Sequence, residues 1–188
     1  MSTAMNPITL ETPRLVLRAY AENDIGALIQ LAGAREVAAT TLRIPHPYTE
    51  QAAHEFVATC TAESMAEPPT RFAITLRGDG QLCGGVGLRL DAPHQHAELG
   101  YWLGVPFWGR GYATEAARAM LDYGFERFQL HRIYASYVAH NVASGKVLRK
   151  IGMKHEGCQR GHICKWEKFY DLELYGMLRS DRTEIVSR

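Results

Sequence analysis

The chain has 188 residues, of which 46% are hydrophobic and 22% charged, and 21 basic side chains oppose 20 acidic ones. This profile is typical of one globular domain and excludes a disordered chain. The net charge of +1 gives no basis for general nucleic-acid binding, and no apolar run approaches the ~18 residues of a membrane span. We therefore expect a cytoplasmic monomer or homodimer with no nucleic-acid and no membrane partner.

The first third of the chain predicts one strand and two helices. Alternating apolar residues predict a strand over Leu15–Tyr20. Helical spacing follows over Ala21–Leu31, where Asn23 or Asp24 could be the N-cap, and returns over Thr49–Met65.

The middle of the chain predicts an antiparallel meander of three strands. These are Arg71–Leu76, Leu82–Leu90 and His96–Leu103, and the turn residues Gly78-Asp79-Gly80 join the first two. The pair Gly84-Gly85 lies inside the second strand, which is typical of a bulge or of a close approach between backbones.

A glycine-rich loop connects this meander to a long helix. The loop reads Trp108-Gly109-Arg110-Gly111-Tyr112-Ala113-Thr114, and apolar spacing predicts a helix over Ala113–Phe128. Such a loop can direct several backbone N–H groups, together with the positive end of the helix, at one anion. It lacks the Lys-Ser/Thr ending of a P-loop and the third glycine of a dinucleotide fingerprint. The sequence thus predicts a phosphate site of another type.

The last third predicts strands over Arg132–Val138, Lys154–Gln159 and Lys168–Leu178, a helix over Ser144–Ile151, and a hairpin loop around Gly161. The order β-α-α-β-β-β-α-β-α-β-β predicts a single mixed α/β domain over residues 13–179, and not a doubly wound nucleotide fold. We expect residues 1–12 and 180–188 to be a loosely ordered extension and tail.

Cysteine and histidine positions give no metal site. Cys60, Cys83, Cys158 and Cys164 show no CxxC spacing, so we expect reduced thiols. The pair His94-x-His96 could bind a metal, but it fits a polar turn better. Residues 1–11 also lack the basic start and apolar core of a signal peptide.

Taken together, the motifs resemble those of GNAT N-acetyltransferases, in the branch similar to the ribosomal-protein alanine/serine N-acetyltransferases. The resemblance covers about Pro13 to Leu178 and implies a mixed, mostly antiparallel sheet of about seven strands with about four helices. Its splayed central strands would bind acetyl-CoA, the expected co-substrate. Besides the glycine loop, the matching pieces are Thr12-Pro-Arg-Leu-x-Leu-Arg18, Glu98-Leu-Gly-Tyr-Trp102, Asn141-x-x-Ser144, Lys150-Ile-Gly-Met153 and Glu156-Gly157.

The resemblance also implies which residues bind the co-substrate. Family members hold the pyrophosphate of acetyl-CoA on the backbone amides of a Q/R-x-x-G-x-G/A segment, and here Trp108 stands in place of the Gln or Arg. Arg110, Lys146 and Arg149 are further candidates for the phosphates, although each could equally be a solvated surface residue. The expected acetyl-CoA-binding residues are Trp102, Leu103, Trp108, Gly109, Arg110, Gly111, Tyr112, Ala113, Thr114, Asn141, Ser144, Lys146 and Arg149.

Acetyl transfer to an amine needs a base for the amine proton and an acid for the leaving thiolate. The resemblance implies Glu98 as the base, with a solvated carboxylate or an arginine partner as the alternative. Ser144 is the candidate acid, with a helix cap as its alternative. Tyr137 and Tyr175 are other candidate acids, although a strand tyrosine is more often part of the core.

An acyl-carrying cysteine is not expected, because direct transfer needs no covalent intermediate and Cys83, Cys158 and Cys164 have no evident histidine partner. The resemblance implies a protein or peptide N-terminal amine as the acceptor. A small amine (polyamine, amino acid or antibiotic) remains an alternative acceptor. A non-catalytic acyl-CoA-binding module, or a structural protein with a glycine turn, remains an alternative function.

Overall fold

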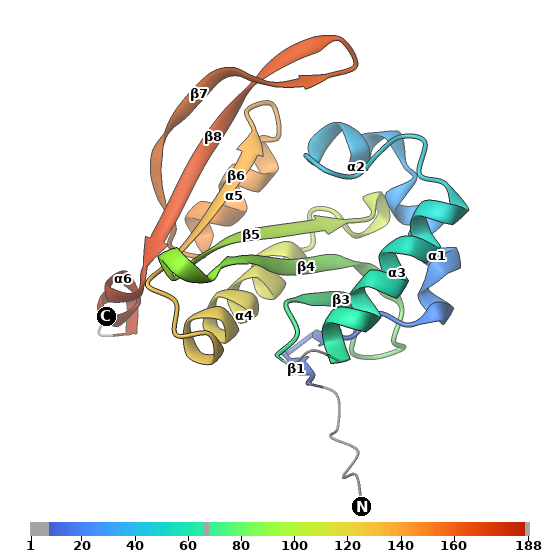
Figure 1. Ribbon diagram of the computed structural model, residues 1–188, viewed down its shortest axis with the longest axis horizontal. Coiled ribbons are helices and arrows are strands. Elements are labelled where there is room, and N and C mark those ends of the chain that lie inside the picture. Colours follow the sequence, from blue (N-terminus) through green and yellow to red (C-terminus); the bar gives the residue numbers. More distant parts are fainter. Residues whose placement is uncertain (1–7, 66–67, 187–188) are drawn as a thin grey trace, which may run out of the picture.

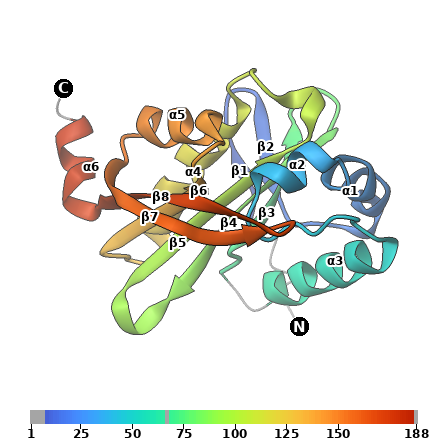
Figure 2. The ribbon, with the colours of Figure 1, turned by 90° about the horizontal axis from the view of Figure 1, so that it is seen from above.

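The computed structural model describes residues 8–65 and 68–186. In these residues the chain forms one eight-stranded sheet of order β1-β2-β3-β4-β5-β6-β8-β7, with helices packed on both faces (Figures 1 and 2). The strands are β1 Leu10–Glu11, β2 Leu15–Arg18, β3 Arg71–Leu76, β4 Leu82–Asp91, β5 His96–Leu103, β6 Arg132–Val138, β7 Lys154–Lys165 and β8 Lys168–Leu178. The helices are α1 Ile25–Ala32, α2 Arg35–Thr40, α3 Glu50–Met65, α4 Tyr112–Arg127, α5 Val142–Lys150 and α6 Arg179–Val186. The predicted mixed, mostly antiparallel single-domain fold is confirmed.

The main core lies between the sheet and α4. Helix α4 buries one apolar face, and the side chains that alternate along the strands meet it there. A smaller cluster packs α1 and α3 against the other face of the sheet, around Tyr20, Leu28, Ala53 and Val57. The sheet is therefore held between two layers of helices, and no helix in the described parts of the chain is long and apolar enough to cross a bilayer.

The centre of the sheet is split between β5 and β6. These two strands are parallel and pair only over His96–Glu98 and Arg132–Tyr134, whereas β5 stays paired with β4 as far as Leu103. Every other strand pair among the described residues is antiparallel. From Leu99 onwards, β5 and β6 therefore diverge, and the β6-facing edge of β5 is left without a strand partner in the described residues.

The C-terminal hairpin differs from its prediction. Strand β7 continues to Lys165, and the turn lies at Trp166 and Glu167, whose φ angles are +49° and +62°. The predicted hairpin loop around Gly161 is therefore wrong. Gly161 has a φ of +56° inside the strand, where the register between Gln159 and Ile163 shifts. A glycine at a β-bulge and a glycine in a turn give the same signal in a sequence.

Both chain ends are more ordered than predicted. Ile8 and Leu10 pack against the main core, and β1 pairs with β2. Helix α6 follows β8 directly. The expected loose ends are therefore wrong over residues 8–12 and 180–186, because tertiary contacts order segments too short to show a periodicity. Residues 1–7 and 187–188 lie outside the described residues. The short α2, with only six residues, was not predicted for the same reason.

Candidate active site

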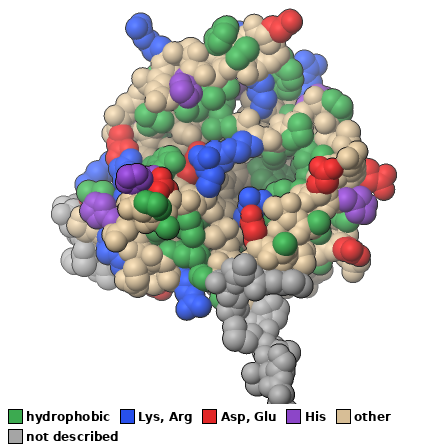
Figure 3. All heavy atoms as spheres, in the orientation of Figure 1, with side chains coloured by type: hydrophobic (Ala, Val, Ile, Leu, Met, Phe, Trp, Pro, Cys, Tyr) green, Lys and Arg blue, Asp and Glu red, His purple; other side chains and the backbone are tan. Residues whose placement is uncertain are grey.

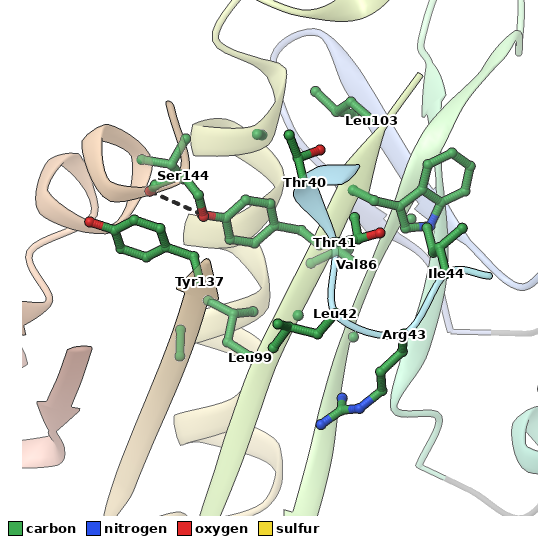
Figure 4. Close-up of a pocket in the computed structure, with 18 of the residues that line it drawn as sticks. Thr40, Thr41, Leu42, Arg43, Ile44, Val86, Leu99, Leu103, Tyr137 and Ser144 are labelled. Atoms are coloured by element: carbon green, nitrogen blue, oxygen red, sulfur yellow. Dashed lines mark hydrogen bonds between the residues drawn. The ribbon is translucent and has the colours of Figure 1, made fainter. Parts of the chain in front are cut away.

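A cavity of about 1330 Å³ opens where β5 and β6 separate (Figure 4). Its lining includes the loop after α2 and the glycine loop that precedes α4, and it also includes parts of β4, β5 and α5. Figure 3 shows this face of the molecule hollowed, with basic side chains gathered beside the hollow. Most of the predicted site residues therefore come together around one cavity.

The glycine loop has the backbone that an anion site requires. Gly109 and Gly111 have φ angles of +74° and +81°, a region that a Cβ atom makes costly. Helix α4 begins at Tyr112, one residue earlier than predicted, and its N-cap Gly111 has no side chain that could occupy the N–H groups of the first turn. Gly109 and the stretch from Gly111 to Thr114 line the cavity. The first-turn N–H groups and the helix dipole suit a pyrophosphate here.

Arg14 is a residue at this loop whose position the sequence did not reveal. Its Nη1 donates to the carbonyl of Arg110 at 2.9 Å, and its guanidinium lies 4.8 Å from the centre of the Tyr112 ring. Glu115 holds the same guanidinium at 2.7 Å and also accepts from Thr12 at 2.6 Å. Arg14 belongs to the segment Thr12 to Arg18, one of the motifs that match the family. In the structure this segment places a cation at the glycine loop, 96 residues away in the sequence.

The two predicted tryptophans lie in different surroundings. The Trp108 indole donates to the carbonyl of Leu103 at 2.7 Å, so this carbonyl already has a partner. The Trp102 indole packs with Tyr20 against the α1 and α3 layer. A Cβ atom on Gly84 would lie 2.1 Å from the Trp102 carbonyl oxygen and 2.8 Å from the Leu103 Cα, so the close approach between backbones predicted for this strand is confirmed, and the β3–β4 register also shifts there.

The sequence left open whether Ser144 caps the helix or acts as an acid, and the structure gives the cap to Asn141. Asn141 Oδ1 accepts from the backbone N–H of Ser144 at 3.2 Å and caps α5, and its Nδ2 donates to the Thr40 carbonyl at 3.0 Å. The helix therefore starts at Val142, and the capping alternative for Ser144 is wrong. Instead, the Ser144 Oγ lies 2.8 Å from the hydroxyl oxygen of Tyr101, the contact dashed in Figure 4. Burial raises the pKa of Tyr101.

The two other candidate tyrosines are not equivalent. Tyr137 lines the cavity, and its hydroxyl reaches α5 so closely that a Cβ on Gly145 would lie 2.4 Å from it. Tyr175 is only 4% exposed, and its hydroxyl accepts from Arg149 Nη1 at 3.1 Å. Neither Tyr175 nor Arg149 is among the described cavity-lining residues, and neither is Arg110, whereas Lys146 is. The tyrosine hydroxyl that contacts Ser144 belongs to Tyr101, which was not among the predicted site residues.

Glu98 is buried and paired with two arginines. Its side chain is 8% exposed, and its Oε2 accepts from Arg43 at 2.6 Å and from Arg89 at 2.5 Å. Its Oε1 lies 3.3 Å from the Ser136 hydroxyl. Burial opposes ionisation of Glu98, but hydrogen bonds and charge from Arg43 and Arg89 outweigh it and lower the pKa. The arginine partnership that the sequence left as an alternative is present.

The remaining candidate groups lie in ordinary surroundings. Burial raises the pKa of the Cys60 and Cys83 thiols to about 11, whereas Cys158 and Cys164 are exposed. The rings of His94 and His96 stack 5.7 Å apart. Within residues 8–65 and 68–186, no group of three histidine, cysteine or acidic side chains could hold a metal ion.

Comparison with known proteins gives four concordant results. Residues 14–154 match the family described as Acetyltransferase (GNAT) domain. An uncharacterized N-acetyltransferase, p20 of Bacillus licheniformis, is 30% identical over 92% of this chain and 97% of its own length. The crystal structure of a GNAT-family acetyltransferase from Bacillus anthracis is similar with a TM-score of 0.82, at 26% identity over 92% of this chain and 99% of that one. RimL, a ribosomal L7/L12 alpha-N-protein acetyltransferase solved with coenzyme A, has a similar fold: its TM-score is 0.79 at 18% identity, over 91% of this chain and 98% of RimL.

Proposed function

The chain belongs to the GNAT family of acetyltransferases, and from that premise we propose that it transfers an acetyl group from acetyl-CoA to the N-terminal amine of a protein or peptide. In this proposal, one half of the cavity, beside the glycine loop and α5, binds the co-substrate. The other half, which Glu98, Arg43 and Arg89 line together with Tyr20 and the α3 layer, binds the acceptor. We call it the acceptor half.

The co-substrate half holds anions by backbone and side-chain groups. Acetyl-CoA supplies an activated thioester. The N–H groups of residues 111–114 receive its pyrophosphate, and Lys146 on α5 lies on the same lining. The free edge of β5 beyond Glu98 offers backbone groups to the extended pantetheine arm, as an added strand would use them. When both substrates are bound in one cavity, the amine and the thioester are held close together, and the transfer becomes effectively unimolecular.

Transfer forms an N–C bond and breaks a C–S bond, so one proton leaves nitrogen and one reaches sulfur. Glu98 takes the amine proton at Oε1, the oxygen that the arginines leave free of an ion pair. Ser144 gives a proton to the leaving sulfur, and the Tyr101 hydroxyl at 2.8 Å holds the Ser144 hydroxyl in place. Tyr101 acts here as a positioning residue, and Tyr137 remains the alternative acid.

The low pKa of Glu98 favours an N-terminal amine. A weak base cannot strip a proton from a strongly basic ammonium, but it can accept one from a nitrogen that becomes acidic as its new bond forms. An α-amine has a pKa of about 8 and is partly neutral in the cell, whereas a lysine-type amine has a pKa of about 10.4. The choice over a polyamine rests on geometry as well, because the exposed guanidiniums of Arg43 and Arg89 beside Glu98 would repel a polycationic acceptor.

The proposal is tested by incubating the full chain with acetyl-CoA and an amine panel, while free thiol is measured and the acceptors are weighed by mass spectrometry. The panel holds peptides with a free α-amine and an internal lysine, free amino acids, and spermidine. We expect thiol release with the peptides and acetylation at the N-terminus rather than at lysine. Turnover of spermidine alone would indicate a small-molecule enzyme, and binding of acetyl-CoA with no turnover would indicate a non-catalytic module.

A further inference from the structure

The acceptor half carries more positive than negative charge. Arg43 and Arg89 share the single carboxylate of Glu98, which leaves one positive charge uncompensated in this group. The other acidic residue on the described lining, Glu63, already faces Arg71 at 3.2 Å. A polycationic acceptor would thus meet a surplus of the same sign.

The two arginines are far more open to a ligand than the carboxylate that they share. The side chains of Arg43 and Arg89 are 60% and 65% exposed, whereas that of Glu98 is 8% exposed. Each guanidinium uses its Nη2 for Glu98, and a guanidinium has five N–H donors in a planar fork. Both arginines can therefore bind a second carboxylate while they keep the first.

The backbone that leads to Arg43 is anchored, and the Arg43 side chain itself is held by Glu98 at 2.6 Å. It projects from the loop that follows α2 (Figure 4). The carbonyls at the end of α2 are bound by three side chains: Lys165 contacts Ala38 and Thr41, His140 contacts Ala39 at 3.0 Å, and Asn141 contacts Thr40 at 3.0 Å. Arg89 lies opposite Glu98 in the β4–β5 register. Both cations are thus preorganised before an acceptor arrives.

From this arrangement we infer that the acceptor carries a carboxylate close to the amine that is acetylated, as in an N-terminus followed by aspartate or glutamate at its second or third position. The inference rests on the proposed function and specifies the substrate class of the same site. Arg43 and Arg89 hold the carboxylate of the acceptor, and the amine then lies beside Glu98 and the point where the strands separate. The same chemistry occurs in a free acidic amino acid, so the test must separate these two sources.

The test compares three peptides of equal length that differ only at the second residue, which is aspartate, asparagine or lysine. Each is assayed with the wild-type chain, with Arg43→Gln and Arg89→Gln, and with Arg77→Gln as a matched control. Arg77 also pairs with an acidic residue, Glu11 at 2.9 Å, but it lies off the described cavity lining. Free aspartate and spermidine are assayed in parallel.

We expect the wild-type kcat/KM for the aspartate peptide to be about tenfold higher than that for the asparagine peptide. This is the gain that one pair of charge-assisted hydrogen bonds gives. The kcat/KM for the lysine peptide should be lower still. Arg43→Gln and Arg89→Gln should each lower this ratio several-fold, mainly through KM, and Arg77→Gln should leave it unchanged. The ratio separates selection from a general effect on Glu98, because a damaged base would slow all three peptides alike.

Two results would overturn the inference, and they bear differently on the proposed function. Equal rates for the three peptides would remove charge selection and leave N-terminal acetylation standing. A preference for spermidine over every peptide would overturn both. Turnover of free aspartate without any peptide would retain the charge selection and contradict the protein acceptor.

Discussion

The hydroxyl oxygens of Tyr101 and Ser144 lie 2.8 Å apart. Tyr101 comes from β5 and Ser144 from the first turn of α5, so the contact joins the two walls of the cavity beside the opening between β5 and β6. Both side chains are half-buried, and each hydroxyl supplies a hydrogen-bond partner for the other. The contact therefore holds the Ser144 hydroxyl at a defined position, and when Tyr101 is the donor the Ser144 proton is available to the sulfur.

Replacing Ser144 by alanine should slow turnover with little loss of stability. The cap of α5 belongs to Asn141, so the helix keeps its N-terminal hydrogen bond in Ser144→Ala. We expect kcat to fall by about 10²-fold, as the loss of a general acid commonly gives, while the Kd for acetyl-CoA changes little. The rate of thiol release measures kcat, and calorimetry measures the Kd for acetyl-CoA.

Asn141→Ala is the control for this prediction. Loss of the cap should lower the free energy of unfolding by about 1 kcal/mol. If Ser144→Ala lowered the melting temperature as much as Asn141→Ala and left kcat unchanged, Ser144 would be a structural residue only. Tyr101→Phe should give a smaller loss of kcat than Ser144→Ala, because it removes only the positioning partner.

Gly111→Val should weaken the binding of acetyl-CoA. A branched side chain at a φ of +81° strains the N-cap of α4 and covers the N–H groups that we assign to the pyrophosphate. We expect a rise in Kd of at least tenfold by calorimetry. Gly80→Val is the matched control, because Gly80 has a φ of +72° in the β3–β4 turn and is not on the described lining. It should cost stability alone, so equal effects on Kd would refute the assignment of the glycine loop.

Glu98→Gln should lower kcat by about 10²-fold and leave the Kd for acetyl-CoA nearly unchanged. Since Arg43 and Arg89 lower the pKa of Glu98, the carboxylate stays ionised throughout the neutral range. The rise of kcat/KM with pH should therefore follow the acceptor amine, with a midpoint near 8, in both proteins. The deficit of the variant should therefore stay the same across this range, because in both proteins it is the amine and not residue 98 that titrates. A variant as fast as the wild type at pH 7 would remove Glu98 from this role.

Stability should be lost on acidification below about pH 4.5. Cationic partners lower the pKa values of Glu156 and Asp181, and for Glu98 two arginines outweigh an opposing effect of burial. For Glu115 burial is likewise outweighed, by hydrogen bonds from Thr12 and from the backbone and side chain of Arg14. A folded-state pKa below the unfolded one adds stability above the unfolded pKa, about 4, and this stability disappears as the pH falls through the folded pKa. Burial raises the pKa of Asp122 and opposes this trend. Denaturation between pH 3 and 8 should show a plateau above pH 5, and an increase in stability on acidification from pH 5 to 3 would contradict these ion pairs.

Local sequence signals predicted most of the elements. The predicted bounds of β3, Arg71–Leu76, match those observed, and helical spacing placed α4 within one residue at each end. The turn at Trp166 and Glu167 was not predicted, because neither residue type favours a left-handed backbone.

The glycine loop was likewise predictable as a candidate anion site, since both its glycines needed the positive φ that only their residue type supplies cheaply. The contacts between distant side chains around the cavity were not predictable. Arg43 and Glu98 are 55 residues apart, and Tyr101 and Ser144 are 43 apart. Nothing in a single sequence shows which distant side chains a fold will bring together. The sequence therefore indicated the chemistry, and the structure identified the partners.

The most direct test of the central claim is a calorimetric titration of the full chain with acetyl-CoA, with desulfo-CoA and ATP titrated alongside. If the cavity between β5 and β6 binds the co-substrate, acetyl-CoA and desulfo-CoA should both bind saturably at one site per chain, and ATP should not. If neither CoA compound binds, the likeness to acetyltransferases extends only to the fold, and the catalytic assignment of Glu98 and Ser144 would be wrong.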